Sequence, residues 1–346
     1  MPNTEPTAAP KRGRIAWIDA LRGLAMAFVV LGHTFPVPEM PLRMWVYSFH
    51  MPLLFVVSGL TWRLPKTSFG AYAKRSAKNL LLPYLVLNVV VYCIKWVLRV
   101  TIDLYENRGV VEPLIAFLLG MDKNLPCIQS WFLPTLLLTQ LLNYLIFRYI
   151  ASERKRAALI CALGVLALAL STFEIGPLPW HLAVVPIALV FHYAGHLWME
   201  YKPYERMHPA VKLLALCALF AAGWYLQSLN GRVSMNGNVY DNPALFFFAA
   251  LCTSFAVVLL VILVLEKSRF LQGIGVCSIF YLGYHGFFTT IAKVYFPTVT
   301  SSDLGCVAAA CVAVLILYPL AKLVTQYCPL LIGKLPARRK TTTSAA

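Results

Sequence analysis

Two ionisable side chains, Arg22 and His33, lie in the first long apolar stretch of the chain, between Ile15 and Thr34. Eleven helical steps of about 100° separate them, which places both on one face of a helix, about 16 Å apart. Asp19, three residues before Arg22, can join them there. Lipid does not tolerate such groups, so they predict a functional site that faces protein or water. The alternative is structural, with a buried Asp19–Arg22 ion pair and a hydrogen-bonded histidine that only hold helices together.

The chemistry that suits these side chains is acyl transfer to an alcohol. A histidine, with an ordinary pKa near 6.5, can take a proton from a hydroxyl at neutral pH and return it to a leaving group. An arginine stays charged in any pocket and binds phosphate or an oxyanion. The sequence has no Gly-x-Ser-x-Gly elbow, so the pattern does not favour a lasting acyl-enzyme on serine.

The composition is typical of a multi-pass membrane protein. Of 346 residues, 60% are hydrophobic and 13% are charged, and the mean hydropathy is +0.70, well above that of ordinary globular domains. The net charge is +16, but the basic residues lie in short clusters between apolar stretches, as topology signals do. We therefore expect a lipid bilayer as the environment and no nucleic-acid partner. The nine cysteines form no Cys-x-x-Cys motif, so neither a disulfide framework nor a metal site is indicated.

Apolar runs long enough to cross about 30 Å of hydrocarbon predict an all-α, polytopic membrane bundle of about ten transmembrane helices. The run 110–120 is too short and is expected to be an interfacial or re-entrant helix. The first span is expected to stay in the mature protein, because no cleavable signal peptide is evident. Cytoplasmic tails are expected over 1–14 and 330–346, around one membrane domain over 15–329. The expected spans are 15–35, 45–63, 79–99, 131–150, 157–173, 180–199, 210–229, 244–265, 272–293 and 303–326.

The distribution of basic residues predicts the orientation of these spans. Of the 30 Lys and Arg residues, 22 fall on the side of the N-terminus, which predicts that both termini are cytoplasmic. Arg22 then lies toward the cytoplasmic half of the first helix and His33 at its outer end. His50, near the outer start of the second span, should lie at a depth similar to that of His33. The sequence thus predicts an outer pocket with two histidines and an arginine below them.

Two stretches carry a family resemblance. The first is WIDALRGLA (17–25) followed by VLGHT (30–34), and the second is SFHMPLLFVVSG (48–59). They resemble the signature of the acyltransferase 3 family, the integral-membrane sugar O-acyltransferases, whose motif of an arginine and a histidine separated by ten residues is matched by Arg22 and His33. The pattern is closest to the branch that resembles fucose 4-O-acetylases. Weaker matches follow in the same order at 75–83, 131–134, 178–195 and 279–285.

The resemblance implies an O-acetyltransferase of the bacterial inner (plasma) membrane. Acetyl-CoA would be the cytoplasmic co-substrate, with no permanently bound cofactor, and the acceptor would be a sugar hydroxyl of a surface glycan or glycolipid, a carbohydrate or lipid-linked sugar. His33 would be the catalytic base or a transient acyl carrier, Arg22 would contact the donor or orient the histidine, and His50 would help to build the acceptor pocket. The chain ends soon after its last span, so transfer is expected to finish in the membrane domain or through a separate protein.

Further candidate residues surround this set. Arg75 and Lys78, at the cytoplasmic start of the third helix, could hold the phosphates of CoA, or could form a basic cluster that only touches lipid headgroups. Tyr281 and His285 are four residues apart and share a helix face. The expected lining of the substrate pocket is Asp19, Ser48, Trp131, Tyr281 and His285.

Two rival functions stay open at this point. An exporter of a glycan or lipid-linked sugar could use the same arginine and histidines for proton coupling. A structural subunit of a glycan-synthesis complex would not need His33 at all. The acceptor sugar and the oligomeric state are also open.

Overall fold

The computed structural model describes residues 15–102, 110–120, 124–173 and 178–334, and these are almost entirely helical. The tail expected over 1–14, and residues 335–346 of the other tail, lie outside the described residues. The α-helices are α1 (Ala16–Thr34), α2 (Pro41–Thr61), α3 (Phe69–Ile102), α4 (Val111–Leu119), α5 (Phe132–Tyr149), α6 (Glu153–Ser171), α7 (Val185–Tyr201), α8 (Pro203–Arg206), α9 (Pro209–Ser228), α10 (Pro243–Leu260), α11 (Arg269–Val276), α12 (Ser278–Tyr295), α13 (Pro297–Thr300) and α14 (Asp303–Tyr327). The shorter elements are η1 (Ile128–Trp131), η2 (Pro179–Val184), the π-helical η3 (Val261–Leu265), η4 (Pro329–Ile332), and a hairpin of β1 (Val233–Ser234) and β2 (Val239–Tyr240).

The predicted membrane bundle is confirmed, with a smaller number of clear spans. A helix occupies each of the ten predicted places, but in the described part of the chain eight helices are long and apolar enough to cross a membrane, or nine if one bent pair counts as a span. α6 falls short because Glu153–Arg156 is a charged first turn. The remaining fifteen residues would rise only about 22 Å.

The ninth predicted span, 272–293, is bent. α11 and α12 meet at Cys277 at an angle of 90°, so the polypeptide turns sharply where one straight helix was expected. α4 has nine residues and would rise about 14 Å, too little for a crossing. Beyond α14, the turn η4 folds back on α12, where the Tyr284 hydroxyl donates to the Leu331 carbonyl at 2.7 Å.

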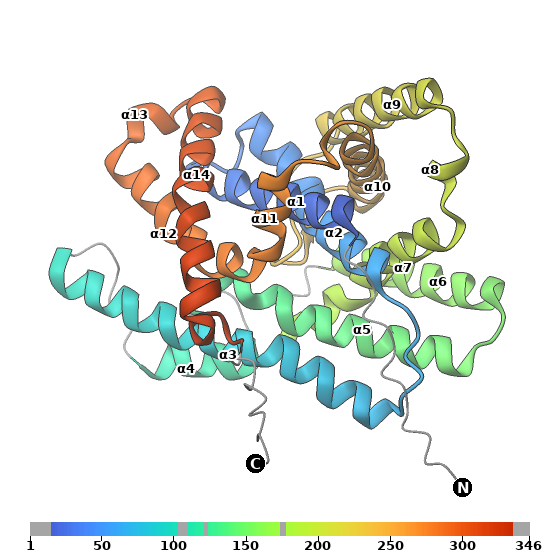
Figure 1. Ribbon diagram of the computed structural model, residues 1–346, viewed down its shortest axis with the longest axis horizontal. Helices are drawn as coiled ribbons and strands as arrows, with labels where there is room; N and C mark the ends of the chain where they lie inside the picture. The colour runs from blue at the N-terminus through green and yellow to red at the C-terminus, as the bar shows by residue number, and fades with distance from the viewer. Residues whose placement is uncertain (1–14, 103–109, 121–123, 174–177, 335–346) are drawn as a thin grey trace, which may run out of the picture.

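The centre of the bundle is formed by α1 and α2, with α12–α14 on one side and α9–α10 on the other (Figure 1). The outer helices carry their apolar side chains outward. In α9, Leu213 and Leu214 are 55% and 71% exposed. Such a surface needs lipid around it, as a membrane-spanning bundle has.

Two reciprocal glycine contacts fix the central helices. A Cβ at Gly23 of α1 would lie 1.9 Å from the Leu271 carbonyl oxygen, and a Cβ at Gly275 of α11 would lie 2.0 Å from that of Asp19. α2 and α7 make the same kind of contact through Gly59 and Gly195, which are described below. Membrane helices associate through such small residues, because lipid provides no hydrophobic drive between them. These crossings set where the ionisable residues of α1 and α2 lie.

Candidate functional site

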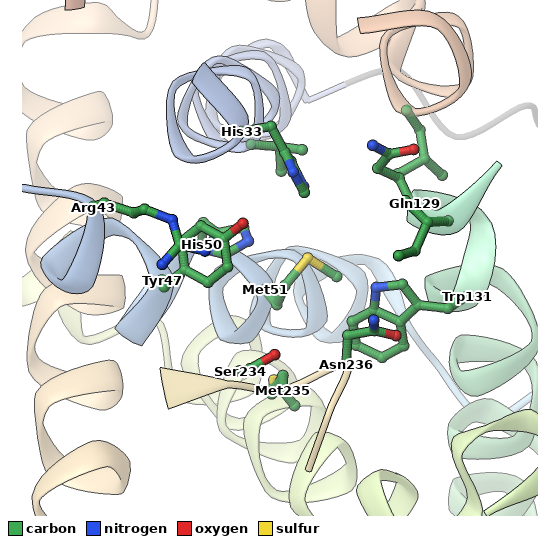
Figure 2. Close-up of a pocket in the computed structure, with 13 residues that line it drawn as sticks. His33, Arg43, Tyr47, His50, Met51, Gln129, Trp131, Ser234, Met235 and Asn236 are labelled. Carbon is green, nitrogen blue, oxygen red and sulfur yellow. The ribbon is translucent and has the colours of Figure 1, made fainter. Parts of the chain in front are cut away.

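A cavity of about 270 Å³ gathers the histidine end of α1 and the start of α2. We call it the histidine cavity. Figure 2 shows His33 of α1 facing Tyr47, His50 and Met51 of α2 across this space, with Gln129 and Trp131 on the far side and hairpin residues 234–236 opposite His33. Its described lining is Val29, His33, Arg43, Tyr47, His50, Met51, Ile128, Gln129, Trp131, Ser234, Met235, Asn236 and Leu282.

Three histidines from three helices meet beside this cavity. The ring centroid of His33 is 6.5 Å from that of His50 and 5.0 Å from that of His285. His33 is half-buried, whereas His50 and His285 are 3% and 0% exposed. The predicted pairing of His33 with His50 is therefore realised in space, and α12 adds His285 to the pair.

The two buried histidines are held in one tautomer. The Nδ1 of His50 lies 2.8 Å from the Val46 carbonyl oxygen, and the Nδ1 of His285 lies 2.6 Å from that of Tyr281. A carbonyl only accepts, so in each neutral ring the proton is on Nδ1 and Nε2 carries a lone pair. The Nε2 of His285 is buried with no hydrogen-bond partner among the described residues. A buried acceptor of this kind can accept a hydrogen bond from a donor group that comes close to it.

Arg43 brings a positive charge to the rim of the histidine cavity. Its guanidinium lies 4.0 Å over the Tyr47 ring, and its NH1 donates to the Pro38 carbonyl at 2.9 Å. No Asp or Glu occurs in the described lining of this cavity. The cavity can therefore accept a neutral or an anionic ligand.

The β1–β2 hairpin closes the side of the cavity opposite His33. His181 Nε2 lies 2.7 Å from Asn236 Oδ1, so the imidazole donates and the Asn236 amide keeps its NH₂ group for the cavity. The His181 ring also packs on Trp131, 4.9 Å between centroids. Trp180 and His181 both have positive φ, 53° and 55°, a strained backbone of the kind found where a fold must aim side chains. Burial raises the pKa of Tyr240, which stacks on Phe246 at the base of the hairpin.

The loop that carries Gln129 and Trp131 is tied to α3. The amide of Asn88 donates to Ser130 Oγ at 2.8 Å and accepts from the Cys127 N–H at 3.0 Å. Lys95 Nζ donates to the Pro126 carbonyl at 2.8 Å. These bonds rigidify the wall of the site, because each ties loop atoms to a long helix.

A second cavity of about 270 Å³ surrounds Arg22, and we call it the arginine cavity. Arg22 NH1 donates to Asp19 Oδ1 at 3.1 Å, and the two side chains are 30% and 13% exposed. Gln140 Nε2 donates to Ser58 Oγ at 3.3 Å on the opposite wall. The described lining is Arg22, Met26, Leu54, Val57, Ser58, Thr61, Leu80, Phe132, Leu133, Leu136, Gln140, Ser278, Ile279 and Leu282.

The two cavities lie end to end along the same helices. On α1, Met26 lines the arginine cavity and Val29, one turn later, lines the histidine cavity. On α2 the order is reversed, because Leu54 lines the arginine cavity and Met51 the histidine cavity, as expected for antiparallel helices. The site therefore consists of two adjacent cavities in the bundle, one beside Arg22 and the other beside the histidines and Arg43.

The structure does not bring every expected residue to these cavities. Ser48 is buried, and its hydroxyl donates to the Trp45 carbonyl of its own helix at 2.7 Å. The Tyr281 hydroxyl donates to the Val314 carbonyl of α14 at 3.0 Å, so it joins helices and does not face the cavity. Arg75 and Lys78 are exposed on α3, outside the described lining of the arginine cavity. Asp19 is outside the described lining of the arginine cavity and contacts Arg22, which lines it.

Several lining residues were not predicted from the sequence, namely Arg43, Tyr47, Gln129, Ser234 and Asn236. The Asn236-Gly237 dipeptide is a common turn signal and could have indicated the hairpin. For Gln129, no local signal exists, since its place depends on how the preceding loop binds α3.

The comparison with known families agrees with this architecture. A family model described as an acyltransferase domain matches residues 15–322. The chain therefore belongs to the acyltransferase 3 family and is a membrane-spanning acyl-transferring enzyme. Among proteins of curated function, none matches the sequence significantly.

Proposed function

We propose that the protein is an O-acetyltransferase that moves an acetyl group from cytoplasmic acetyl-CoA to a sugar hydroxyl of a glycan or lipid-linked sugar in a bacterial inner membrane. The observation that supports this most is the pair of stacked cavities, one with Arg22 and the other with His33. Two substrates can enter from opposite ends and meet inside the bundle. The distance from Arg22 to His33, about 16 Å of helical rise, suits the long thioester arm of CoA.

In this proposal the donor occupies the arginine cavity. The Arg22 guanidinium would bind an anionic oxygen of the donor and would remain oriented by Asp19, since an arginine offers several donors in a fixed fork. Arg75 and Lys78, exposed farther along α3, would draw the phosphates of CoA to this end electrostatically. Both termini and this end would then face the cytoplasm, as the basic residues predict.

The acceptor occupies the histidine cavity. Trp131 offers an aromatic wall, and Gln129 and Asn236 offer amides that can hydrogen-bond to sugar hydroxyls (Figure 2). Apolar surfaces with a few placed polar groups are what a small-molecule site requires. Which sugar binds is set by the positions of these groups.

The proposed reaction needs one base and one returned proton. His33 takes the proton of the acceptor hydroxyl as its oxygen attacks the thioester carbonyl carbon. In this proposal the Nε2 lone pair of His285, whose ring centroid is 5.0 Å from that of His33, would stabilise the resulting imidazolium. The C–S bond then breaks, His33 returns the proton to the CoA sulfur, and the products are the O-acetyl ester and CoA.

The observations support neither of the two rival functions, the exporter and the structural subunit. An exporter would use the histidines for proton coupling, but the family match is to an acyl-transferring domain. A purely structural subunit would not be expected to match an acyl-transferring domain over residues 15–322.

The test is transfer of labelled acetyl from acetyl-CoA to membrane glycan in vesicles that expose either their cytoplasmic or their outer face. Wild type should label acceptor only when acetyl-CoA has access to the cytoplasmic face. His33→Ala and Arg22→Ala should each reduce labelling by about a hundredfold or more. His208→Ala and Arg154→Ala, whose side chains are exposed and outside both cavities, serve as matched controls. Labelling that does not depend on the protein refutes the proposal.

A further inference from the structure

Leu282 of α12 lies where the two cavities meet. It lines both of them, and among the described residues no other does. Its side chain is 4% exposed. Ser278 and Ile279, one turn earlier on α12, line only the arginine cavity, whereas His285, one turn later, contacts the His33 ring. Leu282 therefore stands between the arginine end and the histidine cluster.

The boundary between the two cavities at Leu282 is apolar, and it is short along the helix axes. On α1 and α2 the lining changes from one cavity to the other within one turn, about 5 Å. Where η1 meets α5, it changes between the adjacent residues Trp131 and Phe132. Water enters a narrow apolar constriction poorly, so such a segment can separate two polar compartments.

We infer that Leu282 is the specificity-determining residue for the acyl group, which it selects by cross-section. This inference rests on the proposed function for the identity of the donor. The acyl group is the tip of the thioester arm and must pass Leu282 before it reaches His33. A straight acyl chain is no wider than the arm that follows it, whereas a chain branched next to the carbonyl is wider. Leu282 therefore excludes branched acyl groups, and the length of a straight chain is limited by the histidine cavity instead.

The first test compares acetyl-CoA with isobutyryl-CoA in the vesicle assay. Leu282→Ala should raise the ratio of isobutyryl to acetyl transfer by about tenfold, because a pocket discriminates by such factors for each small apolar group. The ratio of butyryl to acetyl transfer should change much less. Leu282→Trp should retain acetyl-CoA binding while acetyl transfer is lost.

Leu53→Ala is the matched control. Leu53 is 0% exposed on α2 and lines neither cavity, so the same truncation should reduce stability without changing the isobutyryl ratio. If Leu282→Ala leaves this ratio unchanged, or Leu53→Ala raises it equally, the inference is wrong.

The second test needs no donor and separates this inference from the proposed function. Met26→Cys and Val29→Cys place thiols on either side of Leu282, and a small charged thiol reagent is added from one face while labelling is mapped by peptide. In the protein that retains Leu282, reagent added from one face should label only one of the two cysteines. With Leu282→Gly, reagent added from either face should label both cysteines. Wild type that transfers no acetyl would refute the proposed function, while one-sided labelling that persists in Leu282→Gly would refute the barrier.

Discussion

Replacing Gly59 by alanine should separate α2 from α7. A Cβ at Gly59 would lie 1.8 Å from the His192 carbonyl oxygen, and a Cβ at Gly195 would lie 2.1 Å from the Val56 carbonyl oxygen. Both obstacles are backbone atoms of well-packed helices, so no side chain can rotate away. Since real Cβ atoms stay at least 3.0 Å from such atoms, the helices must move apart by about 1.2 Å.

The energetic cost follows from the size of this displacement. Overpacking a core by one methyl group commonly costs 1–3 kcal/mol, and we expect about 3 kcal/mol here because the backbone itself must shift. A movement of about 1 Å would also displace His50, which α2 carries, and misplacement of that size can lower a rate by about a hundredfold. Gly59→Ala should thus reduce both stability and activity.

Gly70→Ala is the matched control, because no atom of the described residues lies within 4 Å of a Cβ built at Gly70 in the first turn of α3. Alanine favours the helix there by about 0.5–1 kcal/mol. Thermal unfolding of the purified protein, followed by circular dichroism, should show Gly59→Ala at least about 5 °C below wild type and Gly70→Ala at or above it. Equal melting temperatures for the two variants would refute the argument from close helix contact.

Three further predictions concern the site and the loop that borders it. His285→Ala should lower kcat by about a hundredfold with acetyl-CoA binding unchanged, because His285 supports the proton on His33; a wild-type kcat would remove it from the mechanism. Asn236→Ala should raise the acceptor KM by about tenfold, the value of one lost hydrogen bond, and an effect on kcat alone would contradict a binding role. Burial raises the pKa of the Cys127 thiol to about 11, so its thiolate should be rare at pH 8 and its alkylation should speed up as the pH rises toward that value. Exposed Cys328 is the comparison, and equally fast alkylation of both thiols at pH 8 would contradict the burial of Cys127.

The pairing of His33 with His50 could be predicted because only local geometry was needed. His33 is at the end of one apolar span and His50 is near the start of the next, so antiparallel helices bring them to one level. His285 was predicted from a motif match and from its four-residue spacing from Tyr281. Of those two residues, only His285 lies against His33, since the Tyr281 hydroxyl binds α14.

Other features depend on contacts that no local pattern encodes. α11 and α12 meet at 90°, and Gly275, just before the bend, packs closely against the backbone of α1. The mostly apolar sequence around Cys277 predicted one continuous span there. Gln129 lies in the site because Asn88 binds the loop before it. Asn236 is aimed by His181, which comes from a distant segment with a strained backbone. Long-range contacts of this kind determine the acceptor side of the site.

The most direct test of the central claim is mass spectrometry of glycans and lipid-linked saccharides from cells that express wild type or His33→Ala at equal levels. Cells are supplied with an isotopically labelled acetyl source, and extracts are compared before and after mild alkali, which removes O-acetyl esters. The proposed function predicts a labelled, alkali-sensitive acetyl group on a saccharide with wild type and its absence with His33→Ala. The same acetylated saccharide in both strains, or in neither, would contradict acyl transfer at His33.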